Sequence, residues 1–468
     1  MWLKKACSSL LNPIKPAYLF VALAVVLAGC SGGTPAPLSI TAVATQPPVQ
    51  ATAAPTLSLP TMQPSAVAAP ATTVPAQATA ATAQPVALAS LKMVDGQTGW
   101  GVSSSGQILR TTAGLNAWQV VSPSELANLP ANPNPELPVA FFLDASHAWI
   151  SYLESNRDLV VQQTADGGQT WQPPTTLPAA DLSGELGPIS FDFLDSQNGW
   201  LWADVHPGMM HVFPILFHTS DGGSSWQTIY NGVPNSGVTQ PVLTGSFSLS
   251  YGSKVFTFLD PSNGLAGTGS LYSTPDGGKT WQTVQLQPPA GLPTFTKPYT
   301  YVTPPVFGSA VDGAVLVTLY EFDNVYLPPG DLFQGLPKAS YLMWTHDGGK
   351  TWSPGKAPAQ DGMLTLLDGN TGWFLGKSDP ATSAASTLFG TTDGGNSWTT
   401  LADHSPLPLA SQLQFINAND GFAIAPERGA LTFFGNYDAR LTPGDYYLYQ
   451  TQDGGKTWNS VQATMKGI

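Results

Sequence analysis

Short apolar segments recur through residues 88–468, and clusters of Gly, Asn, Asp and Pro separate them. The segments are rich in Val, Ile, Phe, Tyr, Trp and Thr, which is the composition of β-strands bounded by turns. Residues 188–230 show the pattern most clearly, with strands expected at 189–194, from 200, at 215–219 and at 227–230. The pattern predicts a repeating unit of four short strands.

A phrase T-x-D-G-G-x-[ST]-W occurs six times, each time between the third and fourth strands of a unit: at 164–171, 219–226, 274–281, 345–352, 391–398 and 451–458. A worn seventh copy at 112–118 has lost its Asp. The Asp side chain can accept hydrogen bonds from nearby backbone N–H groups, and the glycines permit positive φ angles. We therefore expect a rigid turn with a structural role for Asp166, Asp221, Asp276, Asp347, Asp393, Asp453, Trp171, Trp226, Trp281, Trp352, Trp398 and Trp458.

A second turn recurs between the first and second strands, at 94–100, 143–149, 195–200, 259–265, 367–373 and 416–422, with a shortened version at 311–315. The two turns together define seven four-stranded units, and a period of tens of residues indicates a repeat architecture. The prediction is an all-β fold, a seven-bladed β-propeller of antiparallel blades, with a stacked solenoid as the alternative. Because the first unit begins with its first strand and the last ends with its fourth, we expect the ring to close by side-chain packing.

Tryptophan follows the repeat. Of 14 Trp residues, seven end the turn phrase or its worn copy and four open a second strand: Trp100, Trp149, Trp200 and Trp373. A buried indole packs a large apolar surface while its N–H finds a carbonyl. These residues are therefore expected to pack between sheets and not to bind a ligand.

The phrase is the Asp-box, or BNR repeat, of sialidases, sortilin-type receptors, xyloglucan-cleaving propellers and photosystem II assembly and stability factors. Its pairing with N-G-W turns most resembles the last group and its non-photosynthetic bacterial relatives. The resemblance implies a non-catalytic binding or assembly platform for a protein partner. One fold hosts many functions, so surface glycan binding and glycoside hydrolysis are alternatives.

Neighbouring strands in a blade run in opposite directions, so both regular turns leave one face and the longer connections leave the other. Long connections include 204–214, 321–340, 377–386 and 426–445 within units, and 122–138, 173–188, 231–245 and 288–305 between units. Loops on a rigid scaffold often carry binding residues. The candidate binding residues, chosen as aromatic or Arg anchors, are Phe322, Tyr326, Phe333, Arg428, Phe434, Tyr437, Arg440 and Tyr446. The alternative is that these loops only cap the blade ends.

No catalytic residue is predicted. Sialidases bind a carboxylate with three arginines, whereas only Arg110, Arg157, Arg428 and Arg440 follow residue 29, and none precedes Ile-Pro. Other glycosidases need a pair of carboxylates, and no spacing distinguishes one among Glu321, Asp323, Asp331, Glu427, Asp438 and Asp445.

No cofactor or metal is predicted either. His206, His211, His218, Met209 and Met210 have the side-chain chemistry of a copper site. However, His218 directly precedes an Asp-box Thr, so it is expected in a strand away from the loop.

The chain has 10% charged residues and a net charge of −13, which argues against nucleic-acid binding. Its two cysteines are Cys7 and Cys30, so the repeat region can form no disulfide. We expect a monomer.

The first residues read as an export signal. Three lysines (Lys4, Lys5, Lys15) precede an apolar run at 18–28, which is short for a bilayer span. The following L-A-G-C resembles a bacterial lipobox, which implies cleavage before Cys30 and lipidation of its sulfur; ordinary cleavage is the alternative. Residues 30–87 are rich in Ala, Pro and Thr and are expected to form a disordered tether. The predicted organisation is a signal peptide (1–29), a tether (30–87) and a propeller (88–468), lipid-anchored outside the cytoplasm in the periplasm or at the cell surface.

Overall fold

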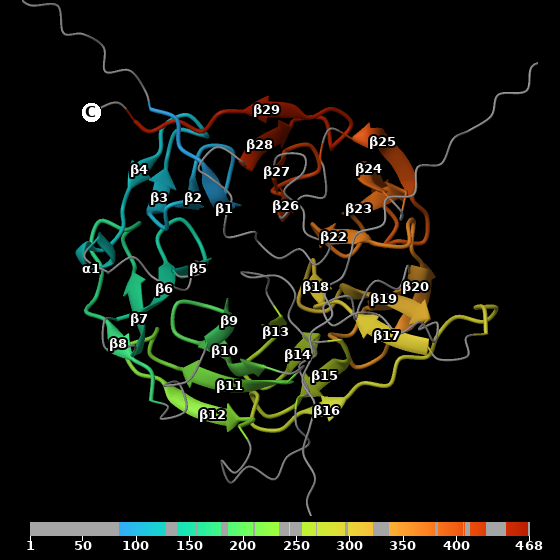
Figure 1. Ribbon diagram of the computed structural model, residues 1–468, viewed down its shortest axis with the longest axis horizontal. Coiled ribbons are helices and arrows are strands. Elements are labelled where there is room, and N and C mark those ends of the chain that lie inside the picture. Colours follow the sequence, from blue (N-terminus) through green and yellow to red (C-terminus); the bar gives the residue numbers. More distant parts are fainter. Residues whose placement is uncertain are drawn as a thin grey trace, which may run out of the picture. The chain divides into compact units, whose positions relative to one another are not determined.

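The protein is described by a computed structural model, which covers residues 84–127, 138–154, 158–178, 186–208, 211–233, 243, 255–267, 269–294, 298–321, 337–379, 382–405, 407, 412–426 and 446–466. The predicted signal peptide, Cys30 and most of the predicted tether lie outside these residues. The described residues form seven antiparallel sheets arranged in a ring (Figure 1), which confirms the seven-bladed propeller. The only helix among them, α1 (Ser124–Ala127), is far too short to cross a bilayer.

Each blade is built from one contiguous stretch of chain, with its strands in sequence order. Blade 1 contains β1 (Leu88–Met93), β2 (Gly99–Ser103), β3 (Ile108–Thr111) and β4 (Gln119–Val120). Blade 2 contains β5 (Val139–Phe142), β6 (Ala148–Leu153), β7 (Leu159–Thr164) and β8 (Thr175–Thr176). Blade 3 contains β9 (Leu186–Phe193), β10 (Gly199–Gly208), β11 (His211–Thr219) and β12 (Gln227–Asn231). Blade 4 contains β13 (Phe256–Phe258), β14 (Gly264–Gly267), β15 (Leu271–Thr274) and β16 (Gln282–Thr283).

Blade 5 is the irregular one, because its first strand is split into β17 (Pro298–Val302) and β18 (Val306–Phe307). Both pieces pair with β19 (Gly313–Glu321), which is followed by β20 (Pro337–Thr345) and β21 (Ser353–Lys356). Blade 6 contains β22 (Gly362–Leu366), β23 (Gly372–Asp379), β24 (Thr382–Thr391) and β25 (Thr399–Ser405). Blade 7 contains β26 (Gln412–Phe415), β27 (Gly421–Pro426), β28 (Tyr446–Thr451) and β29 (Asn459–Val461).

Two of the long connections expected within units are instead strand hairpins. In blade 3, Asp204 pairs with Pro214 and Gly208 with His211, so most of 204–214 extends β10 and β11. In blade 6, Lys377 pairs with Ser386 and Asp379 with Thr382. Polar and Pro residues in these segments suggested loops, but the ladder continues through them because the neighbouring strand supplies partners.

Neighbouring blades meet at a contact that we call a seam. In the seam between blades 3 and 4, Trp200 opens β10 and stacks on Phe258, at the end of β13, with ring centroids 3.7 Å apart. Equivalent stacks join blades 1 and 2 (Trp100 and Phe142), 2 and 3 (Trp149 and Phe193), and 6 and 7 (Trp373 and Phe415). The expected role of these tryptophans in packing between sheets is thus met by a specific aromatic partner in the next blade.

Blade 5 fills the same space from a different strand. The second-strand position that holds Trp in blades 1, 2, 3 and 6 is Ala314 here, and its cross-strand partner in β20 is Trp344. A methyl group added to Gly395 in blade 6 would overlap the Trp344 indole, so this ring lies against the Asp-box of the next blade. An indole therefore reaches this seam although the second strand has Ala314 in place of the usual Trp.

The ring closes between blades 7 and 1 without a shared strand. The side-chain amide of Gln412 accepts from the Leu91 N–H at 2.9 Å and donates to the Leu91 carbonyl. Gln414 does the same with Met93, at 3.0 and 2.7 Å. Each glutamine thus offers β1 the donor and acceptor that a neighbouring strand would offer, which adds hydrogen bonding to the side-chain packing expected here.

Residues 463–466, called the strap below, complete the closure. The strap pairs on one side with residues 84–86, through Val86 N–H to Ala463 (2.9 Å) and Met465 N–H to Gln84 (2.7 Å). On the other side it pairs with the worn Asp-box of blade 1, through Trp118 N–H to Thr464 and Lys466 N–H to Trp118. Residues 84–86, which composition assigned to the tether, are therefore part of the propeller's hydrogen bonding.

Candidate functional site

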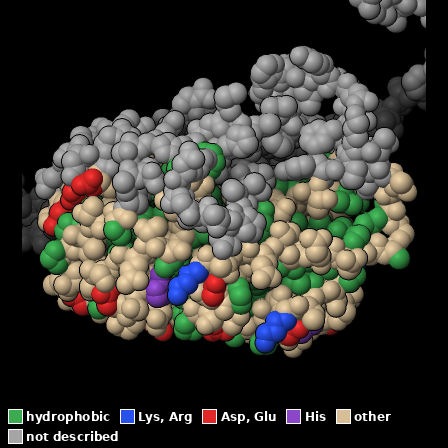
Figure 2. Space-filling view, turned by 90° about the horizontal axis from the view of Figure 1, so that it is seen from below, with side chains coloured by type: hydrophobic (Ala, Val, Ile, Leu, Met, Phe, Trp, Pro, Cys, Tyr) green, Lys and Arg blue, Asp and Glu red, His purple; other side chains and the backbone are tan. Residues whose placement is uncertain are grey.

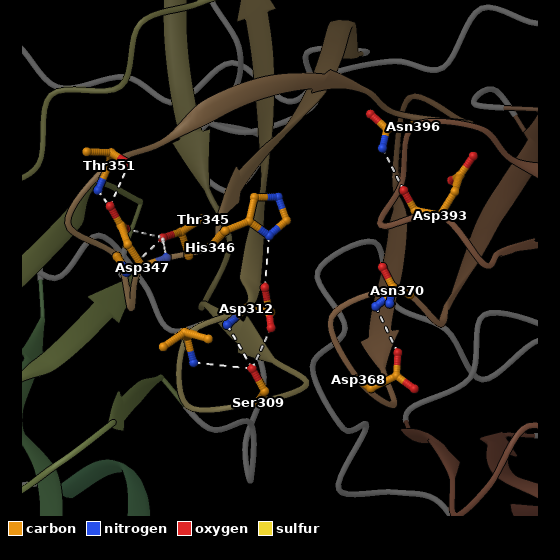
Figure 3. Close-up of polar contacts among 12 residues, drawn as sticks. Ser309, Asp312, Thr345, His346, Asp347, Thr351, Asp368, Asn370, Asp393 and Asn396 are labelled. Carbon is orange, nitrogen blue, oxygen red and sulfur yellow. Dashed lines mark hydrogen bonds and ion pairs between the residues drawn. The ribbon is translucent and has the colours of Figure 1, made fainter.

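The Asp-box of blade 5 shows how the repeated turn uses its polar groups (Figure 3). Thr345 Oγ1 donates to Asp347 Oδ1 at 2.9 Å and accepts from the Gly349 N–H at 2.8 Å. The other donors come from Thr351, whose N–H binds Asp347 Oδ1 (2.9 Å) and whose hydroxyl binds Oδ2 (2.7 Å). Both carboxylate oxygens are used inside the turn.

The same four hydrogen bonds occur in the other intact copies, which are centred on Asp166, Asp221, Asp276, Asp393 and Asp453. Donation by the hydroxyl of Thr170, Thr351 or Ser397 is the largest cause that lowers the pKa of Asp166, Asp347 or Asp393, in each case to about 2. These carboxylates are therefore ionised and already hydrogen-bonded at neutral pH, which leaves them little capacity for a ligand.

The Asp-box also binds the first turn of its own blade. In each blade the N–H at the first Asp-box Gly position donates to a carbonyl of that turn, for example Gly348 to Val311 at 2.9 Å and Gly222 to Gln197 at 2.9 Å. Both sets of turns therefore lie on one face, which we call the Asp-box face. Most of the carboxylates visible in Figure 2 lie along the lower edge of the molecule, interspersed with single Lys, Arg and His side chains.

Blade 5 carries a Ser, an Asp and a His in one turn region, but in an order that does not suit nucleophilic catalysis (Figure 3). Ser309 Oγ donates to Asp312 Oδ2 at 2.7 Å, and Asp312 Oδ1 lies 2.9 Å from His346 Nδ1. A nucleophilic serine must give its proton to the imidazole, whereas here the carboxylate separates the two. His346 and then Ser309 lower the pKa of Asp312, so the group acts as an anion that holds the turn.

The worn Asp-box of blade 1 is aligned one residue earlier than expected. Thr111, not Thr112, pairs with Gly99 at the position that Thr164 takes opposite Ala148. The equivalent of the box Asp is then Ala113, and Thr111 Oγ1 donates to the Gly114 carbonyl. The lack of the Asp and of the second Gly hid this alignment in the sequence.

Arg110, just before this turn, is buried and makes structural hydrogen bonds. Its guanidinium donates to the carbonyls of Gly99 (3.0 Å), Thr111 (2.6 Å) and Ala145 (2.6 Å). The cation also lies 4.8 Å from the ring centroid of Trp100. Since these donors join blades 1 and 2, Arg110 is not positioned to bind the carboxylate of a sugar.

The predicted binding loops leave the face opposite the Asp-boxes, but their residues lie outside the described part of the chain. Phe322, Tyr326 and Phe333 fall between β19 and β20, and Arg428, Phe434, Tyr437 and Arg440 fall between β27 and β28. Tyr446 is the first residue of β28, where only its backbone is placed. The ends of these strands lie at one face.

Two buried ionisable groups near this face were not anticipated from the sequence. Tyr152 is 1% exposed and donates to Gln162 Oε1 at 2.8 Å, and burial raises its pKa, so it is a neutral phenol and no nucleophile. Asp204 in β10 is 3% exposed and accepts from the Trp202 indole at 2.7 Å, while burial raises its pKa to about 6. The sequence placed Asp204 in a loop, so its burial could not be inferred.

His218 is a strand residue at the seam between blades 3 and 4. Its ring centroid lies 4.8 Å from that of Trp200, and burial, together with Lys279, lowers its pKa. The side chains of His206 and His211 are outside the described set. Among the side chains that are described, no group of three or more His, Cys, Asp or Glu residues is arranged to hold a metal ion.

A search against protein-family models finds no match. The chain is 26% identical over 356 residues to the photosystem II assembly lipoprotein Ycf48 of Synechococcus sp. (strain CC9902), an alignment that covers 71% of this chain and 92% of that protein. It is 22% identical over 346 residues to a xyloglucanase from Paenibacillus sp., covering 67% of this chain but only 31% of the enzyme.

Among solved structures, one described as YCF48 bound to D1 peptide aligns with 74% of this chain and 97% of its own, at 17% identity and a TM-score of 0.40. The resemblance to photosystem II assembly factors and to xyloglucan-cleaving propellers, expected from the Asp-boxes, is thus confirmed by the sequence comparisons.

Proposed function

We propose that this protein is a non-catalytic binding or assembly platform, held at a bacterial membrane outside the cytoplasm, which binds a protein partner through the face opposite the Asp-boxes. The observation that carries the proposal is a difference between the two faces in how their polar groups are used. On the Asp-box face the repeated carboxylates and hydroxyls are engaged with their own turns, whereas the strand ends that lead into the variable loops lie at the other face. The similarity to an assembly lipoprotein over most of both chains supports a platform role.

The partner-binding face can be tested by photo-crosslinking of full-length protein in native membranes. A photoreactive amino acid is placed at Tyr326 or Tyr437 on the loops and, as matched controls, at Gln169 or Asn396, whose side chains donate to the carbonyl of their own box Asp. The proposal expects a specific protein adduct from the loop positions. Adducts confined to Gln169 and Asn396 would place the partner on the other face and contradict it.

Membrane attachment through Cys30 is a separate part of the proposal, supported by the lipobox-like L-A-G-C and by the lipoprotein name of the relative. Replacement of Cys30 by Ser should move the protein from the membrane to the soluble fraction and abolish incorporation of labelled fatty acid. A Cys7→Ser variant is the matched control, because Cys7 precedes the expected cleavage. Unchanged fatty-acid labelling of Cys30→Ser would refute lipidation at this residue.

Glycan binding or glycoside hydrolysis is the second candidate, and the similarity to a xyloglucanase favours it. A glycosidase needs two carboxyl groups about 5–9.5 Å apart at the scissile bond. The loop acids available for this role, among them Asp323 and Asp438, are outside the described residues, and no spacing in the sequence distinguishes a pair. Release of reducing sugar from xyloglucan by the purified protein, lost on Asp323→Asn or Asp438→Asn substitution, would favour the enzyme over the platform.

A further inference from the structure

The seam between blades 7 and 1 differs from the tryptophan seams in how it is packed. Phe422 occupies the position of the seam Trp, and Met93 occupies the position of the stacked Phe. These residues share a buried cluster with Leu91, Ile424 and Leu448. Phenylalanine has no N–H, so the bond that Trp373 Nε1 makes to the Gly454 carbonyl of the next blade, at 2.9 Å, has no counterpart here.

The turn of blade 1 at this seam is also incomplete on its own. Without an Asp at position 113, no carboxylate can accept a backbone hydrogen bond from the following residues, as Asp347 does in blade 5. The strap supplies other partners: Trp118 N–H donates to Thr464 (2.9 Å), and Thr464 Oγ1 donates to the Asn116 carbonyl (2.8 Å). The turn is therefore completed by residues that follow the last blade in the sequence.

All bonds across this seam join residues that are far apart in the sequence. Gln412 and Leu91 are separated by 321 positions, and Thr464 and Asn116 by 348. The other seams join consecutive blades, so their contacts close much shorter loops. Contacts that close long loops form late in folding because closing a long loop costs more conformational entropy.

We propose that the propeller opens at the seam between blades 7 and 1, and that the strap is the latch that controls the opening. The strap binds residues 84–86 and the worn Asp-box together, so its release frees blade 1 and the root of the N-terminal segment as one unit. In Figure 1 the red chain beyond β29 runs to the blue start of blade 1. Proteins open locally in cooperative units, and a seam closed only by long-range contacts is suited to be the first.

Hydrogen exchange followed by mass spectrometry tests this by comparing the full-length protein with a shortened chain. A chain ending at Gln462, which lacks the strap, should exchange at least about tenfold faster in peptides covering 84–93 and 111–120, with blades 3 to 6 unchanged. Equal acceleration in every blade would mean that the ring unfolds as a whole, and no acceleration would mean that the strap holds nothing. Either result overturns the proposal.

If the shortened chain does not fold, a Gln412→Leu, Gln414→Leu double variant decides the question. It leaves the strap intact but removes the amides that bind Leu91 and Met93. Selective acceleration in β1 is expected. The matched control is Gln163→Leu, which removes a bond from Gln163 to Ser224 across another seam (3.2 Å) and should leave β1 protected. Acceleration of β1 by the control, or none by the double variant, contradicts opening at the seam between blades 7 and 1.

Discussion

The indole of Trp149 and the ring of Phe193 stack across the seam between blades 2 and 3, with centroids 3.6 Å apart and planes 14° apart. The indole N–H donates to the Gly222 carbonyl at 2.7 Å, and the Gly222 N–H donates to Gln197 in its own blade at 2.9 Å. The Asp-box glycine is thus the point where one blade's two turns meet the tryptophan of the preceding blade. The equivalent bonds of Trp200 to Gly277 and of Trp373 to Gly454 show that this junction recurs.

Replacing Trp149 by Phe should lower the free energy of unfolding by about 1–3 kcal/mol, because the buried Gly222 carbonyl loses its donor while an aromatic ring remains against Phe193. Thermal or urea unfolding measures the change. Trp226→Phe is the matched control, since the Trp226 indole N–H has no hydrogen-bond partner among the described residues. Equal losses in the two variants would show that the bond to Gly222 contributes nothing beyond ring area.

The second glycine of the box should be intolerant of any side chain. Gly395 has φ of +78°, and a methyl group there would overlap Trp344 of blade 5. Gly395→Ala is therefore expected to cost about 2–4 kcal/mol, from left-handed strain plus overpacking. Gly291→Ala isolates the strain, because Gly291 also has positive φ (+84°) but has open space around it. If both variants lose the same stability, the contact with Trp344 is unimportant.

The blade count and the strand directions could be predicted because the turn chemistry is local. Asp347 and Thr351 lie four residues apart, so the phrase itself contains all the atoms that fix the turn. The seams could not be predicted in the same way. That Trp344 replaces the indole missing at Ala314, or that Gln412 serves as a partner for β1, depends on neighbours that only the closed ring brings together.

For the candidate site, the sequence predicts a face of the propeller but not the side chains that form the site. Antiparallel strand order predicts that the variable loops lie opposite the Asp-boxes, and the paired turns show that the two regular turns share one face. Which loop side chains converge depends on loop conformations that no repeat specifies. The buried acid Asp204 was expected in the connection 204–214, whereas the hairpin of β10 and β11 continues past it.

The Asp-boxes should affect stability without affecting partner binding. Asp347→Ala removes the acceptor for Thr345 and Thr351 and should lower the free energy of unfolding by about 1–2 kcal/mol. Binding of the partner, measured by recovery from solubilised native membranes at a temperature where the variant is folded, should not change. Loss of partner recovery in folded Asp347→Ala would place the partner on the Asp-box face.

Asp204 should make the propeller less stable as the pH rises. Burial raises its pKa to about 6, above the value of about 4 expected in the unfolded chain, so folding favours the protonated form. Its stabilising effect is complete below about pH 4, decreases between pH 4 and 6, and is absent above pH 6, a difference of about 3 kcal/mol.

Asp204→Asn tests this, because the variant keeps an oxygen for the Trp202 indole and cannot ionise. We expect the variant to unfold at higher urea concentration than wild type at pH 7.5 and at nearly the same concentration at pH 4. An Asp204→Asn protein less stable than wild type at pH 7.5 would mean that the ionised acid is needed in the fold.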